Sequence, residues 1–201
     1  MKSSFAPFVL GLALLGPASI ARADGDWYAA IDAGNSWIGV FSSSYGDNTD
    51  HGYRLAAGYD IDHYFSVEAG YVDFGKATTT NSCVLNVCLG GVTEFKARAF
   101  TLDGLGHLPL SESWTMFARL GVNRGHLETD SPIGSVSADT TGIDWGFGAD
   151  YRFSEAWKLR LQFEQCQGLG DTQAFKGFGS GIHALKGNVS LTSIGVSYSF
   201  R

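Results

Sequence analysis

The segment 142–164 alternates apolar and polar side chains with a period of two, and this pattern constrains the fold more than any other feature of the chain. The apolar series is Ile143, Trp145, Phe147, Ala149, Tyr151 and Phe153, and after a short turn it resumes with Trp157, Leu159, Leu161 and Phe163. Alternation of this kind gives a β-strand two unlike faces. The segment therefore predicts a hairpin of two long strands.

The composition of the two faces indicates that the apolar face is surrounded by lipid and not by water. The polar positions mix glycine with charges of both signs, and aromatic residues stand near the strand ends. A soluble β-sandwich also alternates, so the period alone leaves both environments open. Strands of about 9–11 residues that are apolar outside, polar inside and bounded by aromatic girdles are what a membrane barrel requires. We therefore predict that the apolar face contacts lipid.

The same pattern recurs along the chain and gives eight strands. We expect them at residues 27–34, 53–61, 64–74, 93–108, 114–123, 142–153, 157–165 and 190–200. The connections alternate between long and short, with long loops at 35–52, 75–91, 124–138 and 167–187. Short periplasmic turns and long external loops are typical of outer-membrane barrels. The predicted fold class is therefore all-β: an eight-stranded antiparallel up-and-down transmembrane β-barrel.

One predicted strand, 93–108, departs from the pattern. Glu94, Lys96 and Arg98 share a parity with Phe100 and Leu102, so charged and apolar side chains fall on one face. A β-bulge that exchanges the faces midway would explain this, and bulges are common at barrel rims. The sequence leaves the face of the nearby Asp103 open.

The first 23 residues have the pattern of a secretory signal peptide. Lys2 is followed by an apolar run from Phe5 to Ile20 and by Ala21-Arg22-Ala23, an A-x-A cleavage site. The alternative, an uncleaved anchor, is disfavoured because the run is shorter than the ~20 residues that span a bilayer. We expect a signal peptide at 1–23 and one barrel domain at 24–201. Loss of the signal leaves 12 basic and 20 acidic residues, a formal charge of −8, which argues against nucleic acid as a partner.

The inward face of the predicted barrel carries charges of both signs. An eight-stranded barrel is just wide enough for side chains to fill, and a buried charge is far less costly when it is paired. We therefore predict a structural salt-bridge network in the lumen. The alternative is a catalytic or ion-conducting group that includes Glu68, Asp150 and Arg160. The predicted inward set, five acids and four arginines, is Asp32, Arg54, Glu68, Arg119, Asp144, Asp150, Arg152, Arg160 and Glu164.

The three cysteines give one candidate pair. Cys83 and Cys88 lie close together in a glycine-flanked polar segment, which predicts a small disulfide in an oxidising compartment. A metal site is the alternative, but no second cysteine pair and no nearby histidine complete a tetrahedral set. Cys166 is interpreted as structural. No metal site and no cofactor are predicted.

Several segments resemble the OmpA-type transmembrane barrel family, and the resemblance extends over nearly all of the chain after the signal. GYDIDHYFSVEAGYVDFGK resembles the family's second hairpin, GADYRFSEAWKLRLQFEQ the penultimate hairpin, SIGVSYSF the last strand and WYAAIDAG the first. The resemblance implies interior salt bridges at Glu68, Arg119, Asp150 and Arg160. At Asp32 the sequence departs from the family, because OmpA itself has a lysine there.

The resemblance also implies a location and partners. The chain ends at Arg201, directly after the last strand, so we expect a barrel-only member that resembles OmpX or the opacity proteins and lacks a peptidoglycan-binding domain. Its place would be the outer membrane of a Gram-negative bacterium, in contact with lipid and lipopolysaccharide. Tyr198 and Phe200 resemble the strand signal that the barrel-assembly machinery reads, after delivery by periplasmic chaperones.

The predicted function is non-enzymatic: a structural role, or recognition of a host or surface ligand through the external loops. The loop residues that we expect to make contacts are Trp37, Phe41, Tyr45, Phe175 and Phe178. A narrow channel for small solutes or ions is the alternative. A lipid-modifying enzyme is less favoured, because a histidine and a serine would have to meet near the membrane, and none of His51, His63, His107, His126 and His183 lies in a recognised serine motif.

Overall fold

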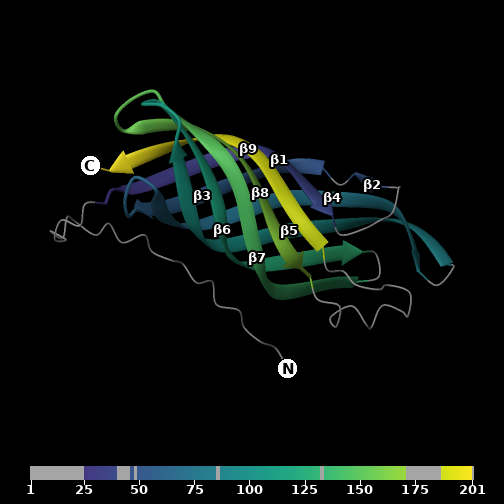
Figure 1. Ribbon diagram of the computed structural model, residues 1–201. Helices are drawn as coiled ribbons and strands as arrows, with labels where there is room; N and C mark the ends of the chain where they lie inside the picture. The colour runs from purple at the N-terminus through teal and green to yellow at the C-terminus, as the bar shows by residue number, and fades with distance from the viewer. Residues whose placement is uncertain are drawn as a thin grey trace.

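The chain forms antiparallel strands joined in sequence order, as the computed structural model in Figure 1 shows. The structure describes residues 25–39, 46–47, 49–84, 87–131, 134–170 and 187–200. Among these residues, no helix is long and apolar enough to cross a membrane. The strands are β1 Trp27–Gly39, β2 Gly46–Asp47, β3 Thr49–Asp60, β4 Phe65–Val84, β5 Val87–Pro109, β6 Trp114–Ser131, β7 Gly134–Arg152, β8 Trp157–Leu169 and β9 Gly187–Phe200.

Eight long strands close into a barrel. Each pairs antiparallel with its neighbour in the order β4, β3, β1, β9, β8, β7, β6 and β5, and the β4–β5 pairing closes the ring. The first and last strands pair along their whole length, from Trp27 opposite Phe200 to Gly39 opposite Asn188. Closure leaves no sheet edge within the ring, so every strand can satisfy its backbone groups where the ring lies in hydrocarbon. This confirms the predicted eight-stranded antiparallel barrel, to which the two-residue β2 adds a short pairing with β4.

Three tight turns mark one end of the barrel, which we call the turn end. They follow β3, β5 and β7, and in each a backbone N–H donates back across the turn, as from Ile61 to the carbonyl of Phe65 at 2.9 Å. In the first turn the Asp62 carboxylate accepts from the backbone N–H groups of Tyr64 and Phe65 at 2.7 and 2.8 Å. Aspartate and serine favour such turns because their side chains cap nearby N–H groups. Both Trp27 and Phe200, at the two ends of the barrel domain, lie at this end.

At the opposite end, the loop end, two hairpins are much longer than the sequence predicted. β4 and β5 contain 20 and 23 residues, and β6 and β7 contain 18 and 19. The expected loops at 75–91 and 124–138 are therefore wrong, because most of these residues continue the strands. Beyond the membrane both faces of a strand meet water, so its apolar alternation fades although the hydrogen-bond ladder continues. Figure 1 shows the β4–β5 hairpin extending furthest.

The expected exchange of faces in strand 93–108 does not occur. The odd-numbered residues of β5 from Phe95 to Leu105 are buried, and its pairing with β6 is unbroken from Glu94 to Pro109. Glu94, Lys96 and Arg98 thus face outward at the loop end, where they meet water. The register shifts lie instead between β4 and β5, at Asp73/Lys76 and Thr80/Ser82, and Gly75 has a φ of 73° there.

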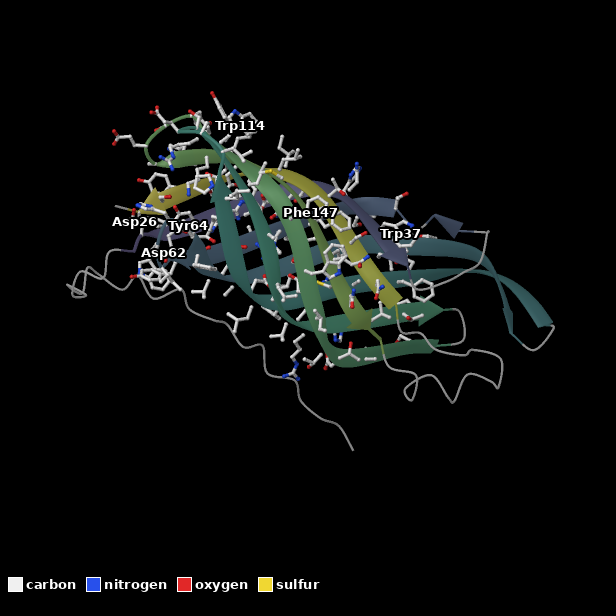
Figure 2. The ribbon with its side chains drawn as sticks, in the orientation of Figure 1. Asp26, Trp37, Asp62, Tyr64, Trp114 and Phe147 are labelled. Carbon is white, nitrogen blue, oxygen red and sulfur yellow. The ribbon has the colours of Figure 1, made fainter. Side chains whose placement is uncertain are left out.

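The outer surface is apolar and carries aromatic side chains at two levels. At the turn end the ring pairs Trp114–Tyr151 and Trp157–Tyr198 both lie 4.9 Å apart between centroids. Nearer the loop end, Tyr71 contacts Phe100 at 5.1 Å. In Figure 2, Trp114 and Trp37 lie toward opposite ends of the barrel, with Phe147 between them. Two such levels fit the aromatic girdles of a membrane barrel.

Tyr28 gives the interior a packing constraint that can be tested. Gly58 lies directly opposite Tyr28 in the β1–β3 pair, and a Cβ on Gly58 would overlap the Tyr28 ring. The ring cannot easily move, because its hydroxyl donates to Glu68 at 2.8 Å. We expect Gly58→Ala to lower the free energy of unfolding by about 1–3 kcal/mol, the usual effect of overpacking.

The measurement is urea unfolding of the protein refolded in lipid vesicles. Gly106→Ala is the matched control, because a Cβ on this strand glycine meets nothing within 4 Å. Equal unfolding curves for the two variants would contradict the role assigned to the close approach of Tyr28 and Gly58.

Candidate functional site

The interior of the barrel is organised around the Glu68 carboxylate. Glu68 points inward from β4, and its Oε1 accepts hydrogen bonds from Arg54 Nη1 at 2.6 Å and Arg119 Nη2 at 3.0 Å. Its Oε2 accepts from Arg160 Nη1 and from the Tyr28 hydroxyl, both at 2.8 Å. All five residues are at most 3% exposed. One carboxylate therefore connects β1, β3, β4, β6 and β8 at a single level of the lumen.

Two further carboxylates hold the same arginines from the other side. Asp150 binds Arg160 through both oxygens, at 2.9 Å to Nε and 3.1 Å to Nη2. The two residues are opposite each other in the β7–β8 pair. Glu164 Oε2 lies 2.8 Å from Arg54 Nε and 3.3 Å from Arg119 Nη1. Each guanidinium is thus shared between carboxylates, which reduces the free-energy penalty of burying these charges.

Aromatic rings complete the surroundings of Arg160. Its guanidinium carbon lies 4.8 Å from the centroid of the Phe117 ring and 5.7 Å from that of Tyr28. Cation–π contacts of this length are favourable, most of all where water is excluded. The central layer is therefore fixed by packing as well as by charge.

Of the nine residues predicted for the lumen network, the structure brings six into ion pairs within 4 Å. Asp32 and Asp144 are buried at 1% and 0% exposure, but the ion pairs of the described residues do not include them. Asp32 lies opposite Arg54 in the β1–β3 register, yet its carboxylate oxygens have no hydrogen-bond partner in the described part of the chain. The six paired residues are Arg54, Glu68, Arg119, Asp150, Arg160 and Glu164.

The prediction for Arg152 is wrong. Arg152 is the last residue of β7 and is exposed, because the strand leaves the barrel at the turn that follows. Its position in the alternating pattern assigns its side chain to the inward face, but at the barrel rim an inward side chain meets solvent. Parity alone does not show how far a residue lies from the rim.

Sequence reasoning missed two members of the network. Asp103 is 2% exposed, and its Oδ2 lies 3.3 Å from Arg54 Nη2. The regular parity of Phe95, Thr101 and Leu105 would have placed Asp103 inward, had no bulge been assumed. Tyr28 shares the inward parity of Asp32, and only its aromatic ring argued against a polar role.

Above the charged layer, toward the loop end, the lumen is filled with apolar side chains. These residues come from seven of the eight barrel strands, and most are less than 5% exposed. The predicted salt-bridge network accounts for the middle of the lumen, and this apolar cluster was not predicted. Its members are Ile38, Val72, Phe74, Ala77, Phe95, Ala97, Ala99, Leu127, Ala138, Cys166, Leu169, Val189 and Leu191.

Below the charged layer, a pocket of about 570 Å³ opens at the turn end. Its lining includes Asp60, His107 and Arg152. Figure 2 shows two more of its lining residues, Asp62 and Tyr64, at this end. His107 Nε2 lies 2.8 Å from Ser66 Oγ, a serine–histidine contact that the sequence analysis did not find. Ser66 is 2% exposed, so its hydroxyl is largely shielded from solvent.

The remaining predicted residues lie on the outside or outside the described residues. Trp37 is 48% exposed and belongs to β1, beyond the predicted strand end. Tyr198 and Phe200 face outward on β9 at 36% and 54% exposure. Cys83 and Cys88 lie directly opposite each other near the end of the β4–β5 hairpin. Phe41, Tyr45, Phe175 and Phe178 lie outside the described residues, as does His183.

The comparisons with known proteins agree with this geometry. The family model for the OmpA-like transmembrane domain matches residues 22–201. Comparison with curated proteins found no match.

Among solved structures, Neisserial surface protein A (NspA) is similar at 16% identity and a TM-score of 0.58, over 87% of this chain and 97% of NspA. A major outer membrane protein of Thermus thermophilus is similar at 15% identity and 0.59, over 88% and 99%. Ail of Yersinia pestis is similar at 16% identity and 0.55, also over 88% and 99%. Likenesses at this identity show the fold.

The position of Glu68 among three arginines predicts a large effect of its neutralisation. Glu68→Gln keeps the side-chain shape but removes the charge that three buried guanidiniums share. The substitution removes the closest charged partner of Arg54 and one partner each of Arg119 and Arg160, and loss of one side of a buried ion pair is strongly destabilising, so we expect the free energy of unfolding to fall by about 3–5 kcal/mol.

Urea unfolding in lipid vesicles, followed by tryptophan fluorescence, measures this change. Glu94→Gln is the control, because it breaks the exposed Lys76–Glu94 pair, whose atoms lie 3.6 Å apart. Exposed pairs add little to stability, so its curve should stay close to that of the parent. A Glu68→Gln curve that coincides with the control would refute the structural importance of the network.

Proposed function

The chain belongs to the OmpA-like transmembrane domain family, and we propose that it is a non-enzymatic barrel that acts at the cell surface through its loop-end hairpins. Its place is the outer membrane of a Gram-negative bacterium, where proteins of this family and fold reside. There the short turns lie on the periplasmic side and the loop end faces outward. The proposed role concerns the loop end.

The length of the loop-end strands carries this proposal. A membrane needs about 9–11 residues of a tilted β-strand, whereas β5 has 23 and β4 has 20. At about 3.4 Å per residue, β5 is about 75–80 Å long. Roughly half of the β4–β5 hairpin therefore stands above the membrane as paired strand. A paired hairpin of this length offers a large surface for recognition, since binding residues are often carried on such segments.

The filled lumen supports a protein that does not conduct. A channel needs a continuous hydrated path, but the charged layer around Glu68 and the apolar cluster above it occupy successive levels of the same lumen. Apolar constrictions exclude water and so act as barriers to ions. A narrow channel remains the second candidate, favoured only by the pocket at the turn end, which gives periplasmic solutes access to one side of the charged layer.

The proposal assigns no reaction to the barrel. Ser66 and His107 are hydrogen-bonded, but Ser66 is buried inside the lumen. An enzyme that acts on membrane lipid needs its nucleophile on the outside of the barrel, within reach of the lipid. The Ser66–His107 pair is better explained as polar packing beneath the charged layer.

The charge of the hairpins bears on the kind of partner. Ail of Yersinia pestis was crystallised with the heparin analogue sucrose octasulfate. On the present chain, outward cations of β5 are matched by nearby acids: Lys96 with Asp130 at 3.1 Å and Arg98 with Asp73 at 3.1 Å. Such a surface of mixed charge suits a protein or glycan of low net charge better than a polyanion. We infer that the partner is of this kind.

Three further proposals concern the termini and the cysteines. We propose that residues 1–23 are removed on export and that the outward Tyr198 and Phe200 on β9 are read by the assembly machinery. We also propose a disulfide between Cys83 and Cys88, which occupy directly opposite positions in the β4–β5 ladder. Cysteines at opposite positions of an antiparallel pair are within the Cα range that a disulfide can bridge. It would brace the hairpin near its tip.

Planar-bilayer recording tests the closed lumen. We expect the purified protein to give no stable single-channel steps at any voltage that the membrane tolerates, because no hydrated path crosses the apolar cluster. A general porin inserted into the same membranes is the positive control. Steps whose size changes in Arg160→Gln would support the channel and overturn the proposal of a non-conducting barrel.

Shortening the β4–β5 hairpin tests the surface role. Residues 80–92 can be replaced by Asn-Gly, a two-residue hairpin turn, so that the Thr79–Thr93 pair directly precedes it. The charged layer is untouched, so we expect the variant to reach the outer membrane and to shift on a detergent gel only when heated. We expect cells that display it to attach less than parent cells to wells coated with matrix proteins or neutral glycans.

Two controls accompany the attachment assay. The Cys83→Ser/Cys88→Ser variant keeps the full hairpin, and heparin-coated wells test a polyanionic partner. Stronger attachment to heparin than to the other surfaces would refute the inferred partner class. Equal attachment on every surface by parent cells and cells that lack the protein would refute the surface role itself.

A further inference from the structure

The buried interior contains more acids than bases. Within the described residues, six carboxylates and three guanidiniums of the lumen are at most 3% exposed. The carboxylates are Asp32, Glu68, Asp103, Asp144, Asp150 and Glu164, and the guanidiniums are Arg54, Arg119 and Arg160. Burying unmatched charge is strongly unfavourable. The interior therefore requires additional positive charge, either as protons or as a bound cation.

Part of this carboxylate excess lies at the upper edge of the charged layer, under the apolar cluster. Asp144 on β7 lies directly opposite Cys166 on β8, and Glu164 is two residues before Cys166 on the same face. One ligand atom from each of these three residues lies within 4.8 Å of the other two. All three residues have 0% exposure. Their donor atoms thus converge on one enclosed point.

Unpaired oxygen atoms point to a missing cationic partner at this place. Asp144 Oδ2 and Glu164 Oε1 have no hydrogen-bond partner in the described part of the chain, although both side chains are fully buried. Cys166 Sγ donates to Asp144 Oδ1 at 3.2 Å. Glu164 Oε2 also lacks a hydrogen-bond partner among the described residues, although it lies at an ion-pair distance of 2.8 Å from Arg54 Nε. Fully buried carboxylate oxygens without any partner are rare in native proteins.

A glycine allows a third carboxylate to approach. Gly121 on β6 pairs with Asp103 on one side and with Asp144 on the other. A Cβ on Gly121 would overlap the Asp103 carboxylate, so only glycine lets that side chain lean toward Asp144. Asp103 Oδ1 also lacks a hydrogen-bond partner among the described residues. Asp103 thus lies beside the cluster, although the donor atoms within 4.8 Å of one another are those of Asp144, Glu164 and Cys166.

We propose that Asp144, Glu164 and Cys166, with Asp103 beside them, form a buried structural site for a zinc-like divalent cation. A thiol with two or three carboxylates is a borderline-soft donor set, which suits Zn²⁺ better than Ca²⁺ or Mg²⁺. Zinc ligands at 2.0–2.3 Å from the ion lie about 3.3–3.7 Å apart in a tetrahedron. The present donors, which lie within 4.8 Å of one another, need to close by about 1.5 Å at most to reach that spacing.

Binding involves a proton but no electron transfer. The Cys166 S–H bond breaks, a Zn–S bond forms, and the thiol proton leaves to water. The net gain of one positive charge offsets part of the acid excess. The apolar cluster that includes Cys166 covers the site from the loop end, so the ion would stabilise the fold and would not meet a substrate.

Cobalt binding tests the site directly. In a Cys83→Ser/Cys88→Ser background, Cys166 is the only thiol, and a thiolate ligand gives Co²⁺ a near-ultraviolet charge-transfer band. Since the site is enclosed, the protein is folded into detergent with Co²⁺ or Zn²⁺ present and then freed of loose metal by dialysis. We expect one ion per chain, the thiolate band, and displacement of Co²⁺ by Zn²⁺.

Matched variants locate the ion. Asp144→Asn and Cys166→Ser should each weaken Zn²⁺ binding by more than tenfold, because even residues behind the ligands typically contribute that much. His126→Ala is the control, since the exposed His126–Asp139 pair, 2.8 Å apart, is another candidate ligand outside the lumen. The gel shift on heating shows that each variant has folded.

Other results would overturn the proposal. Folded background protein that retains no metal and shows no band would mean that protons alone balance the acids. Binding that His126→Ala abolishes, or that Cys166→Ser and Asp144→Asn leave unchanged, would place the ion elsewhere. If either lumen variant fails to fold, X-ray absorption of the zinc-loaded background protein tests the site instead. A zinc coordination shell without sulfur would exclude Cys166 as a ligand and overturn the proposal.

Discussion

The contact between Glu68 and three arginines is the interaction on which the rest of the barrel interior depends. Arg54, Arg119 and Arg160 come from β3, β6 and β8, and Glu68 itself from β4. Contacts across the lumen of this kind are available only when the sheet has closed in the right register, because a shift by one residue would turn every charge toward lipid. The network therefore selects the register as well as stabilising the closed barrel.

The lumen is layered, and each layer has a different physical role. At the turn end a pocket admits water, in the middle the charged groups share hydrogen bonds, and toward the loop end apolar side chains exclude water. Exclusion of water on one side strengthens the electrostatic contacts of the middle layer, since the local dielectric is low. The apolar cluster thus does more than fill space, because it keeps the ion pairs around Glu68 dry.

The parity of side chains could be predicted from sequence wherever the outer face meets lipid. It placed Glu68, Asp150 and Arg160 inward, because a polar residue between apolar neighbours has only one direction available. It failed where lipid no longer imposes a pattern. The long hairpins above the membrane were expected as loops, and Arg152 at the rim was expected in the network. The position of a residue along the barrel axis depends on strand tilt and register, and neither can be read from the alternation within one strand.

The net charge of the lumen was also predicted incorrectly from sequence, because burial near the rim and in β5 could not be judged from parity. Counting Arg152 as buried and leaving Asp103 unassigned gave near neutrality, whereas the structure exposes Arg152 and buries Asp103. Removing one cation from the interior and adding one carboxylate both make the interior more negative. An eight-stranded barrel has no space to hydrate that excess, so it must be compensated by protons or by a cation held where unpaired oxygens converge. The Asp144–Glu164–Cys166 cluster is where the described residues offer those oxygens, so the charge of the lumen and its proposed metal site follow from the same burial.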